Sequence, residues 1–339
     1  MRPTLSDLAD AAGVSTATVD RVLNDRPGVS ARTRGLVRDA ARRIGYLPGA
    51  EGATPTLTLA ALLPGGPNRF VAELRAHLVA MAHDDPGLTL HLPDIPDLDP
   101  TTMADALNAL GACDGVAVLA LTHPLVHAAL HQLTARNIPV VTLATDLPDT
   151  RRLAYIGIDN MRAGRLAGQV ITRFLGPAPA GTVALFAGTL AYRGHMEREM
   201  GLRQVLSEDA PFLHLLELRE SREDRDRAYG EAQALLAAHP DLVAIYNAGG
   251  GTSGIARALR ESGRRLVFVA HEATDPNKAL LLDGTLDAVI DQNARDEARE
   301  ALATLTAAAR GVAHAVIPPR LHLILRENLP TDPPPPGSA

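Results

Sequence analysis

Cysteine, lysine, tryptophan and long apolar runs are scarce or absent in this sequence. Its single cysteine, Cys113, cannot form an intrachain disulfide, which excludes a small scaffold held by disulfides. No run approaches the ~18 consecutive apolar residues that a membrane-spanning helix needs. The N-terminal residues MRPTLSDLAD contain no apolar signal core. We therefore expect a cytoplasmic protein that does not contact a membrane.

The charge is unevenly distributed along the 339 residues. Only Lys278 of the 33 basic residues is lysine, and the formal net charge is -6. Residues 1–50 hold eight arginines and five aspartates, which gives +3 and leaves -9 on the rest of the chain. A basic segment on an acidic chain is typical of a nucleic-acid-binding arm. A chain of this length is expected to form two or three folding units.

The first 48 residues predict three short helices. Thr4 and Asp7 form a capping box for the first helix, and Gly13 permits the turn that ends it. Ser15 can cap a second helix that runs to Asn24, and Ser30 can open a third. The spacing of the apolar residues buries one face of each helix, so we expect a compact helical module.

Glycine, proline and alanine dominate residues 49–56, which predicts a linker. From Leu57 to Asp291, about ten apolar strand-like runs alternate with helical stretches, a pattern typical of parallel sheets covered by helices. Ten strands exceed one comfortable sheet, so two α/β lobes are expected. The Pro-rich residues 331–339 predict a disordered tail.

The second helix has the chemistry of a DNA-reading helix. Its outward residues are Thr16, Ala17, Asp20 and Arg21. Arginine can donate two hydrogen bonds to guanine O6 and N7, and small side chains can contact thymine methyl groups or phosphates. In a helix–turn–helix, residues at the start of the second helix contact base edges in the major groove.

The pattern T-L-x-D-L-A-x-x-A-G-V-S-x-A-T-V-x-R-V-L-N over residues 4–24, with the matches that follow to Pro48, resembles the headpiece of the lactose-repressor (LacI/GalR) family. The resemblance implies a homodimer that binds a palindromic, double-stranded operator, usually as a repressor. The DNA-binding residues that it implies are Thr4, Ser15, Thr16, Ala17, Thr18, Asp20, Arg21, Asn24, Ser30, Thr33, Arg34 and Tyr46.

Two positions depart from that family pattern. Asp20 stands where a small polar residue is usual, and a carboxylate there repels phosphates unless it accepts a hydrogen bond from cytosine N4 or pairs with a neighbouring arginine. Pro55 occupies the position of the family's minor-groove leucine. Proline and glycine oppose a hinge helix in this linker, so we expect it to act mainly as a tether.

Residues 57–330 are also similar to the family's effector domain, which has the periplasmic-sugar-receptor fold. The expected fold class is thus a small all-α helix–turn–helix headpiece (1–48) followed by a type I periplasmic-binding-protein-like α/β domain of two parallel-sheet lobes. The first lobe would comprise about 57–157 and 290–320, and the second about 158–289 and 321–330.

The resemblance implies a small effector in the crevice between the lobes, such as a sugar, polyol, sugar acid or sugar phosphate, which changes operator affinity. The effector-binding residues that we expect are Asn68, Phe70, Asp146, Arg193, His195, Arg198, Asn247, Glu272 and Gln292. Arg193, His195 and the neighbouring His271 suggest a further hypothesis, that the ligand is acidic or phosphorylated.

Two other functions compete with this interpretation. Gly249-x-Gly251-x-x-Gly254, with Glu272 beyond it, matches the fingerprint of an NAD-dependent oxidoreductase. A solute-binding receptor without DNA function would share the larger fold. The expected protein is a regulator, not an enzyme, with no catalytic site, metal or cofactor. His123, His127 and His131 recur every four residues, but without a Glu or Cys partner they favour a polar helix face.

Overall fold

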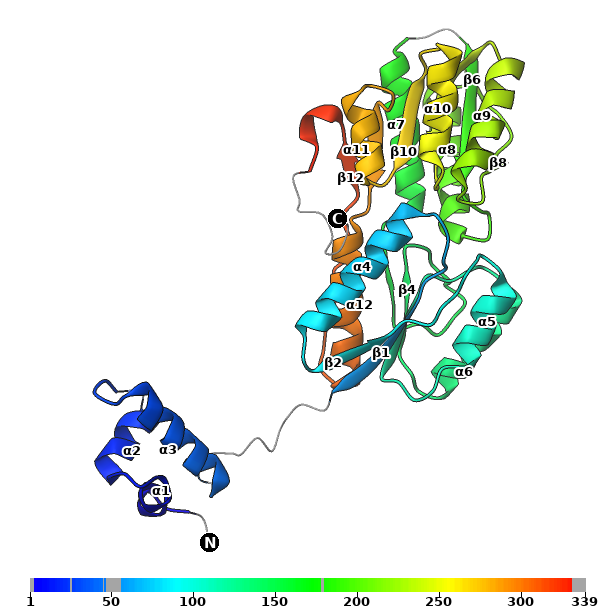
Figure 1. Cartoon of the computed structure of the whole chain (residues 1–339). Helices are drawn as coiled ribbons and strands as arrows, with labels where there is room; N and C mark the ends of the chain where they lie inside the picture. The colour runs from blue at the N-terminus through cyan, green and yellow to red at the C-terminus, as the bar shows by residue number, and fades with distance from the viewer. Residues whose placement is uncertain (1–2, 25, 45, 47–55, 178–179, 331–339) are drawn as a thin grey trace. The chain divides into compact units, whose positions relative to one another are not determined.

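The computed structural model describes residues 3–24, 26–44, 46, 56–177 and 180–330. The chain divides into two compact units, residues 1–56 and 57–339 (Figure 1). Pro48 of the expected headpiece and residues 49–55 of the expected linker lie outside the described residues, as does the expected tail at 331–339. Within the described residues, no helix is both long and apolar enough to cross a membrane.

The N-terminal unit is a three-helix module, as predicted. Its helices are α1 (Leu5–Ala12), α2 (Thr16–Leu23) and α3 (Ala31–Arg43). Thr4 and Asp7 form the capping box of α1, Gly13 ends that helix in the left-handed conformation at φ 63°, and the Ser15 hydroxyl accepts from the N–H of Thr18. The small core that joins the helices consists of Leu8, Ala9, Val19, Val22, Val37, Ala40 and Ala41.

The larger unit contains two sheets, each with helices against it. The first sheet is wholly parallel, in the order β2-β1-β3-β4-β5. Its strands are β1 (Leu57–Leu62), β2 (Leu88–His91), β3 (Gly115–Val118), β4 (Val140–Leu143) and β5 (Ala154–Ile156). The helices of this lobe are α4 (Arg69–Asp84), α5 (Pro100–Asn108), α6 (Pro124–Ala135) and α12 (Ala294–Ala309). α12 packs beside α4 although more than 200 residues separate them in the chain, since Asp84 ends one and Ala294 begins the other.

The second sheet has the order β12-β11-β10-β9-β6-β7, and β8 also pairs with β6. Its strands are β6 (Gly181–Ala187), β7 (Leu213–Leu215), β8 (Arg219–Glu220), β9 (Leu242–Asn247), β10 (Val267–His271), β11 (Ala288–Asp291) and β12 (His322–Ile324), of which only β12 runs antiparallel to its neighbour. The helices of this lobe are α7 (Asn160–Leu175), α8 (Arg193–Asp209), α9 (Arg225–Ala238), α10 (Thr252–Ser262) and α11 (Asp275–Leu282), followed by a 3₁₀ turn at Arg326–Asn328.

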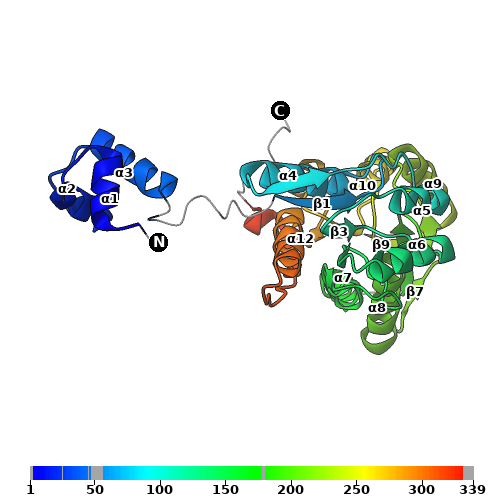
Figure 2. The same ribbon diagram turned by 90° about the horizontal axis from the view of Figure 1, so that it is seen from below.

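Helices cover both faces of the second sheet. Successive side chains along a strand point to opposite faces, so alternate residues pack against different helices. Val183 and Leu185 of β6 pack with residues of α7 and α8, whereas Ala184 and Phe186 of the same strand pack with residues of α9, α10 and α11. Figure 2 shows α7 and α8 on one side and α9 and α10 on the other. Buried on both faces, these strands are continuous apolar runs, the signal that predicted them.

The chain passes between the lobes three times: between β5 and α7, between β11 and α12, and between α12 and β12. β11 pairs with β10, so Ile290 and Asp291 belong to the second sheet. The crossing therefore falls after Asp291, slightly later than the boundary expected at about 290. The predicted fold class, a helical headpiece followed by two lobes with parallel sheets, is confirmed.

Candidate ligand cavity and nucleic-acid interface

A cavity of about 790 Å³ lies where the strands of both lobes end. Its wall comes from segments that follow β1, β3, β4, β6, β8, β9, β10 and β11. The carboxyl ends of parallel strands are the usual ligand-binding edge of such sheets, and this volume suits a small molecule. The cavity thus joins segments from about Gly66 to Gln292 in a single site.

Six of the nine expected effector residues line this cavity: Asn68, Phe70, His195, Arg198, Glu272 and Gln292. These six residues lie in the crevice, as the effector hypothesis expects. Their role in binding stays a prediction.

The other three expected residues do not line the cavity. Asp146 accepts from Arg152 Nη2 at 2.6 Å and from the Thr142 hydroxyl at 3.1 Å. Arg193 pairs with Glu197 one turn along α8, with 2.7 Å between Nε and Oε1. Each side chain is held by a neighbour in sequence, and neither residue belongs to the described cavity wall.

Asn247 is the third residue outside the wall, and it organises the loop after β9. Its Nδ2 donates to the carbonyl oxygens of Gly249 and Gly250 at 2.9 and 3.2 Å, and to Thr252 Oγ1 at 3.0 Å. The side chain is fully buried, so it shapes the part of the wall formed by residues 249–253 without contacting the cavity.

Arg198 is the central charged group of the wall. The residue is buried, with 4% of its surface exposed. Its Nε donates to Asn160 Oδ1 at 2.8 Å, and its Nη1 donates to the Ala248 carbonyl at 2.7 Å. Its Nη2 lies 4.0 Å from Glu272 Oε1. A buried cation needs such partners, and they hold the guanidinium at the cavity while leaving N–H groups of its fork for a ligand.

Glu272 and Gln292 form a polar pair in the wall. Gln292 Nε2 donates to Glu272 Oε1 at 2.7 Å, while Glu272 Oε2 and Gln292 Oε1 have no hydrogen-bond partner. Burial, followed by the charge of Asp291, raises the pKa of Glu272 to about 8. Glu272 also adopts φ 69°, an uncommon backbone conformation for a residue other than glycine.

Glu223 is a cavity residue that the sequence did not indicate. It is buried, and its Oε2 accepts from Asn68 Nδ2 and from the N–H of Gly250, both at 2.7 Å. Asn68 belongs to the first lobe and Glu223 to the second, so this hydrogen bond joins the lobes across the cavity. The carboxylate comes from a highly charged stretch, residues 220–227, in which no local pattern distinguishes it from solvent-exposed neighbours.

The cavity histidines are held in the neutral form. Burial, then the charge of Arg198, lowers the pKa of His195 to about 3. The same two causes, in that order, hold the pKa of His271 well below its usual value, and its Nε2 lies 2.7 Å from the Tyr246 hydroxyl. With Arg193 outside the wall as well, the three residues that suggested an acidic ligand bring no positive charge to it.

The glycines of the dinucleotide-like motif are explained by contacts within the protein. A Cβ on Gly249 would lie 2.4 Å from the backbone nitrogen of Gly188, and one on Gly254 would lie 1.8 Å from the carbonyl oxygen of Arg225. Gly251 has φ 88°, which favours glycine. Gly251 and Gly254 thus allow α10 to pack closely on α9, and Gly249 allows the loop after β9 to approach Gly188, so contacts within the protein explain all three glycines.

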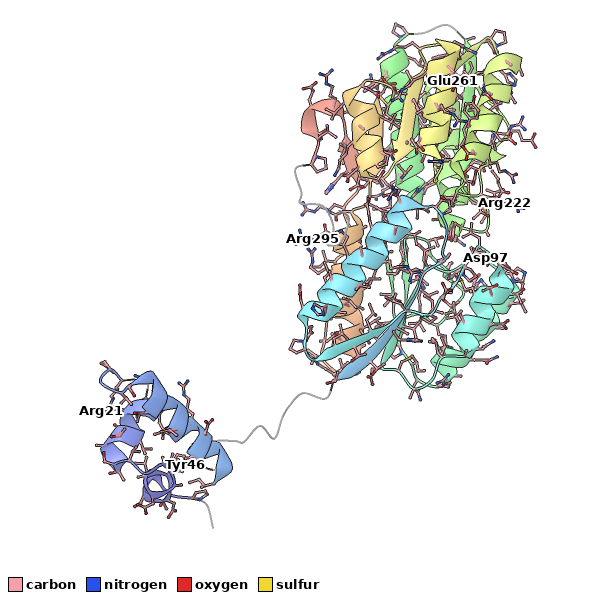
Figure 3. The ribbon with its side chains drawn as sticks, in the orientation of Figure 1. Arg21, Tyr46, Asp97, Arg222, Glu261 and Arg295 are labelled. Carbon is pink, nitrogen blue, oxygen red and sulfur yellow. The ribbon has the colours of Figure 1, made fainter. Side chains whose placement is uncertain are left out.

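The N-terminal unit presents part of α2 to solvent. Thr16, Ala17 and Arg21 are exposed, whereas Val19 and Val22 are buried beneath them. Figure 3 labels Arg21 on this helix. Among the other expected DNA-binding residues, Thr4 and Ser15 cap helices. Thr18 and Thr33 bond to Ser15 and Ser30, Arg34 Nη2 donates to the Arg26 carbonyl, and Tyr46 packs against the helical core.

Asp20 has partners within the module. Asn24 Nδ2 donates to Asp20 Oδ1 at 2.8 Å, and Arg26 Nη1 donates to Asp20 Oδ2 at 3.1 Å. Of the two alternatives at this position, pairing with a neighbouring arginine is therefore the one that the structure shows. The pair offsets the negative charge on the exposed face of α2.

The fold and the cavity define a two-lobed ligand-binding protein, here with a helix–turn–helix module. Residues 59–313 match the periplasmic binding protein domain, and residues 4–49 match the bacterial regulatory proteins of the lacI family. The chain therefore carries a lacI-family domain at residues 4–49 and belongs, over residues 59–313, to the periplasmic binding protein domain family, as the sequence patterns predicted.

Individual relatives agree with this assignment. The chain is 31% identical over 160 residues to the ribose import binding protein RbsB of Escherichia coli, and the aligned region covers 46% of this chain and 52% of RbsB. It is 27% identical over 215 residues to the HTH-type transcriptional regulator DegA of Bacillus subtilis, 61% of this chain and 62% of DegA. The chain thus matches between about half and three-fifths of the length of these relatives.

The fold of the larger unit also matches solved structures. The glucose-galactose binding protein GanP of Geobacillus stearothermophilus superposes with a TM-score of 0.74 and 23% identity, over 82% of this chain and all of GanP. At this identity the match supports the fold alone.

Proposed function

We propose that the protein is a ligand-responsive transcription regulator that does not act as an enzyme. The N-terminal unit binds operator DNA through α2, and the two-lobed unit binds a small, hydroxyl-rich effector in its cavity. The observation that carries the proposal is the presence in one chain of an exposed, arginine-bearing helix of a helix–turn–helix module and a polar cavity between two lobes. A solute receptor has no use for the first feature.

The proposed DNA contacts lie on the exposed face of α2 and the adjoining loops. Arg21 is the main base-reading residue, Thr16 and Ala17 contact bases or phosphates, and the serines and threonines at the helix starts contact phosphates. Binding as a homodimer places two such helices about one turn of DNA apart, on a near-palindromic site. We propose that the protein represses transcription rather than activating it, because the family that its headpiece resembles consists mainly of repressors.

Selection of DNA sequences from a random pool by the full-length protein tests the DNA-binding half of the proposal. We expect a palindromic consensus, bound by a dimer in sedimentation experiments. Arg21→Ala should weaken binding to that consensus by about 1–3 kcal/mol. Arg151→Ala, which removes an exposed arginine of the larger unit, should leave the affinity unchanged. Enrichment of no sequence, or equal binding by the Arg21 variant, would contradict the proposal.

A thermal-shift screen with sugars, polyols, sugar acids and sugar phosphates tests the effector half, because a bound ligand stabilises the folded state in proportion to RT ln(1 + [L]/Kd). NAD belongs in the same screen. If NAD were the one compound that stabilised the protein, the glycine motif would indicate an NAD-dependent oxidoreductase instead of a regulator.

A further inference from the structure

We propose that the effector carries a protonated amine in addition to hydroxyl groups, and that this amine binds at Glu272 and Gln292. The inference rests on the proposed role of the cavity as the effector site. It names the class of ligand, an amino sugar or hydroxylated amine, that the chemistry of the wall selects.

The first observation is a pair of unused acceptors. Glu272 Oε2 and Gln292 Oε1 have no partner, although their side chains are joined by a 2.7 Å hydrogen bond in the cavity wall. Gln292 is 2% exposed, so water does not freely solvate it. Buried acceptors without donors are costly. An ammonium group has three donors and no acceptor, whereas a hydroxyl has one donor, so the amine satisfies both oxygens at once.

The second observation is the charge of the buried wall. Of the described residues that line the cavity, Arg198 is the one buried cation; its Nη2 lies 4.0 Å from Glu272 Oε1, and its charge also acts on the carboxyl group of Glu223. Glu297 is not part of the wall and is fully buried, and burial, followed by the charge of Glu272, holds the pKa of Glu297 well above its usual value. The interior therefore holds more carboxyl groups than cations.

Groups at the mouth do not reverse this balance. Arg69 and Arg225 line it together with Asp224 and Asp226, and all four residues are exposed. Their charges are opposite in sign and equal in number, and salt screens exposed charges efficiently. Since the cavity histidines are neutral, they do not attract an anionic ligand, whereas a bound cation would favour ionisation of the buried carboxyl group beside it.

The third observation is the backbone conformation of Glu272, which its neighbours hold fixed. Its φ of 69° lies in the left-handed region, and Asn277 Nδ2 donates to the carbonyl oxygens of both His271 and Glu272, at 2.9 and 2.8 Å. Strained conformations that the surroundings hold fixed are concentrated at functional sites. Burial and the charge of Asp291 raise the pKa of this carboxyl group to about 8, so an adjacent ammonium ion would return it to the ionised form.

The experiment compares matched sugars against the full-length protein by thermal shift and calorimetry. The probes are D-glucosamine, D-galactosamine and D-mannosamine, each with its parent sugar, its N-acetyl derivative and the corresponding sugar acid. Acetylation keeps the size near the nitrogen but removes the charge. We expect the amine of at least one set to bind about tenfold or more tightly than its parent and its N-acetyl form, the factor for one charge-assisted hydrogen bond.

Glu272→Gln should abolish this preference for the amine, because it removes the carboxyl group that pairs with the ammonium, so the ratio of the amine's affinity to that of its parent sugar should fall to about one. The substitution imitates the protonated carboxyl group and is expected to fold, which its melting curve verifies. Asp226→Asn removes a carboxylate from the exposed mouth and should leave the preference intact. If Glu272→Gln does not fold, Gln292→Leu, which removes the second acceptor, should reduce the same preference.

The alternative outcomes separate this inference from the proposed function. Equal or tighter binding of the neutral parent in every set, or binding of the sugar acids alone, overturns the amine inference and leaves the cavity as an effector site. Absence of binding by every compound in all sets overturns both.

Discussion

At the scale of single residues, Arg198 links the parts of the cavity wall. It bonds to Asn160 at the start of α7 and to the Ala248 carbonyl after β9, and it faces Glu272 after β10. Removing it would leave an amide, a carbonyl group and a carboxyl group buried without their partner. Loss of one member of a buried polar network costs more than loss of an exposed pair.

Arg198→Ala should therefore lower the free energy of unfolding by about 3 kcal/mol. The matched control is Arg203→Ala on the same helix, whose exposed ion pair with Glu199 should contribute less than about 1 kcal/mol. Urea denaturation of the two variants measures the difference. Equal losses would show that the Arg198 network does not hold the wall together.

Glu272 predicts how stability depends on pH. Its pKa is raised from 4.5 to about 8 in the folded protein, whereas that of His195 is lowered from 6.5 to about 3. Well above pH 6.5 the histidine is neutral in both states, but Glu272 keeps its proton only when folded. Unfolding then releases a proton, so stability should fall as pH rises from about 6.5 to 8, by at most about 1.4 kcal/mol per pH unit for this group.

Urea denaturation across that pH range tests the slope. Glu73, whose pKa is raised to about 7 chiefly by burial, contributes in the same direction over the lower part of the range. Glu272→Gln should make the slope shallower, since glutamine does not titrate. A variant with the wild-type slope would mean that Glu272 is ionised in the folded protein throughout.

Residue positions at strand ends were predictable from the sequence, but side-chain partners were not. Asp146 follows β4 at the correct edge of the sheet, yet Arg152 holds its carboxylate. Glu223 lies in the wall because of its bonds with Asn68 and Gly250, which are distant in the sequence. Local pattern indicates which residues lie at the sheet edge, whereas the hydrogen-bond partners of each side chain, near in sequence for Asp146 and distant for Glu223, decide whether it belongs to the cavity wall.

At the scale of secondary-structure elements, the glycines of α9 and α10 provide a matched pair of substitutions. A Cβ on Gly254 of α10 would lie 1.8 Å from the Arg225 carbonyl oxygen, whereas one on Gly230, inside α9, would meet nothing within 4 Å. Gly254→Ala should push the helices apart and cost about 1–3 kcal/mol. Gly230→Ala should stabilise the protein by about 0.5–1 kcal/mol, the usual gain in a helix interior.

Thermal unfolding of the two variants measures these effects, which are opposite in sign. If Gly254→Ala were as stable as the wild type but no longer bound its ligand, the glycine would serve ligand approach, as the dinucleotide motif implies, and not helix packing.

Elements with strong local signals were the most predictable. The capping residues Thr4 and Ser15 and the turn at Gly13 act within a few residues of chain, so the helices of the N-terminal unit follow from local chemistry. The buried strands were recognisable as apolar runs. The short β8 carries no such run, because its two residues, Arg219 and Glu220, are only half-buried, and it pairs through the register of β6.

At the scale of the whole molecule, the net charge of -6 is the sum of +3 on residues 1–50 and -9 on the rest of the chain. The basic N-terminal segment belongs to a separate compact unit, and the acidic remainder belongs to the unit that contains the cavity. In the proposed regulator, the ligand must favour one conformation of the proposed dimer over another, since a ligand shifts an equilibrium only by its differential affinity for the two states.

The most direct test of this account is the operator affinity of the full-length protein, measured by fluorescence anisotropy with and without the ligand identified in the sugar screen. We predict that the ligand changes the operator Kd by about 5–150-fold, the range typical of allosteric coupling. Arg198→Lys, which keeps the charge but loses the fork, should bind operator normally and lose this response. An operator Kd that saturating ligand leaves unchanged in the wild type would contradict the account.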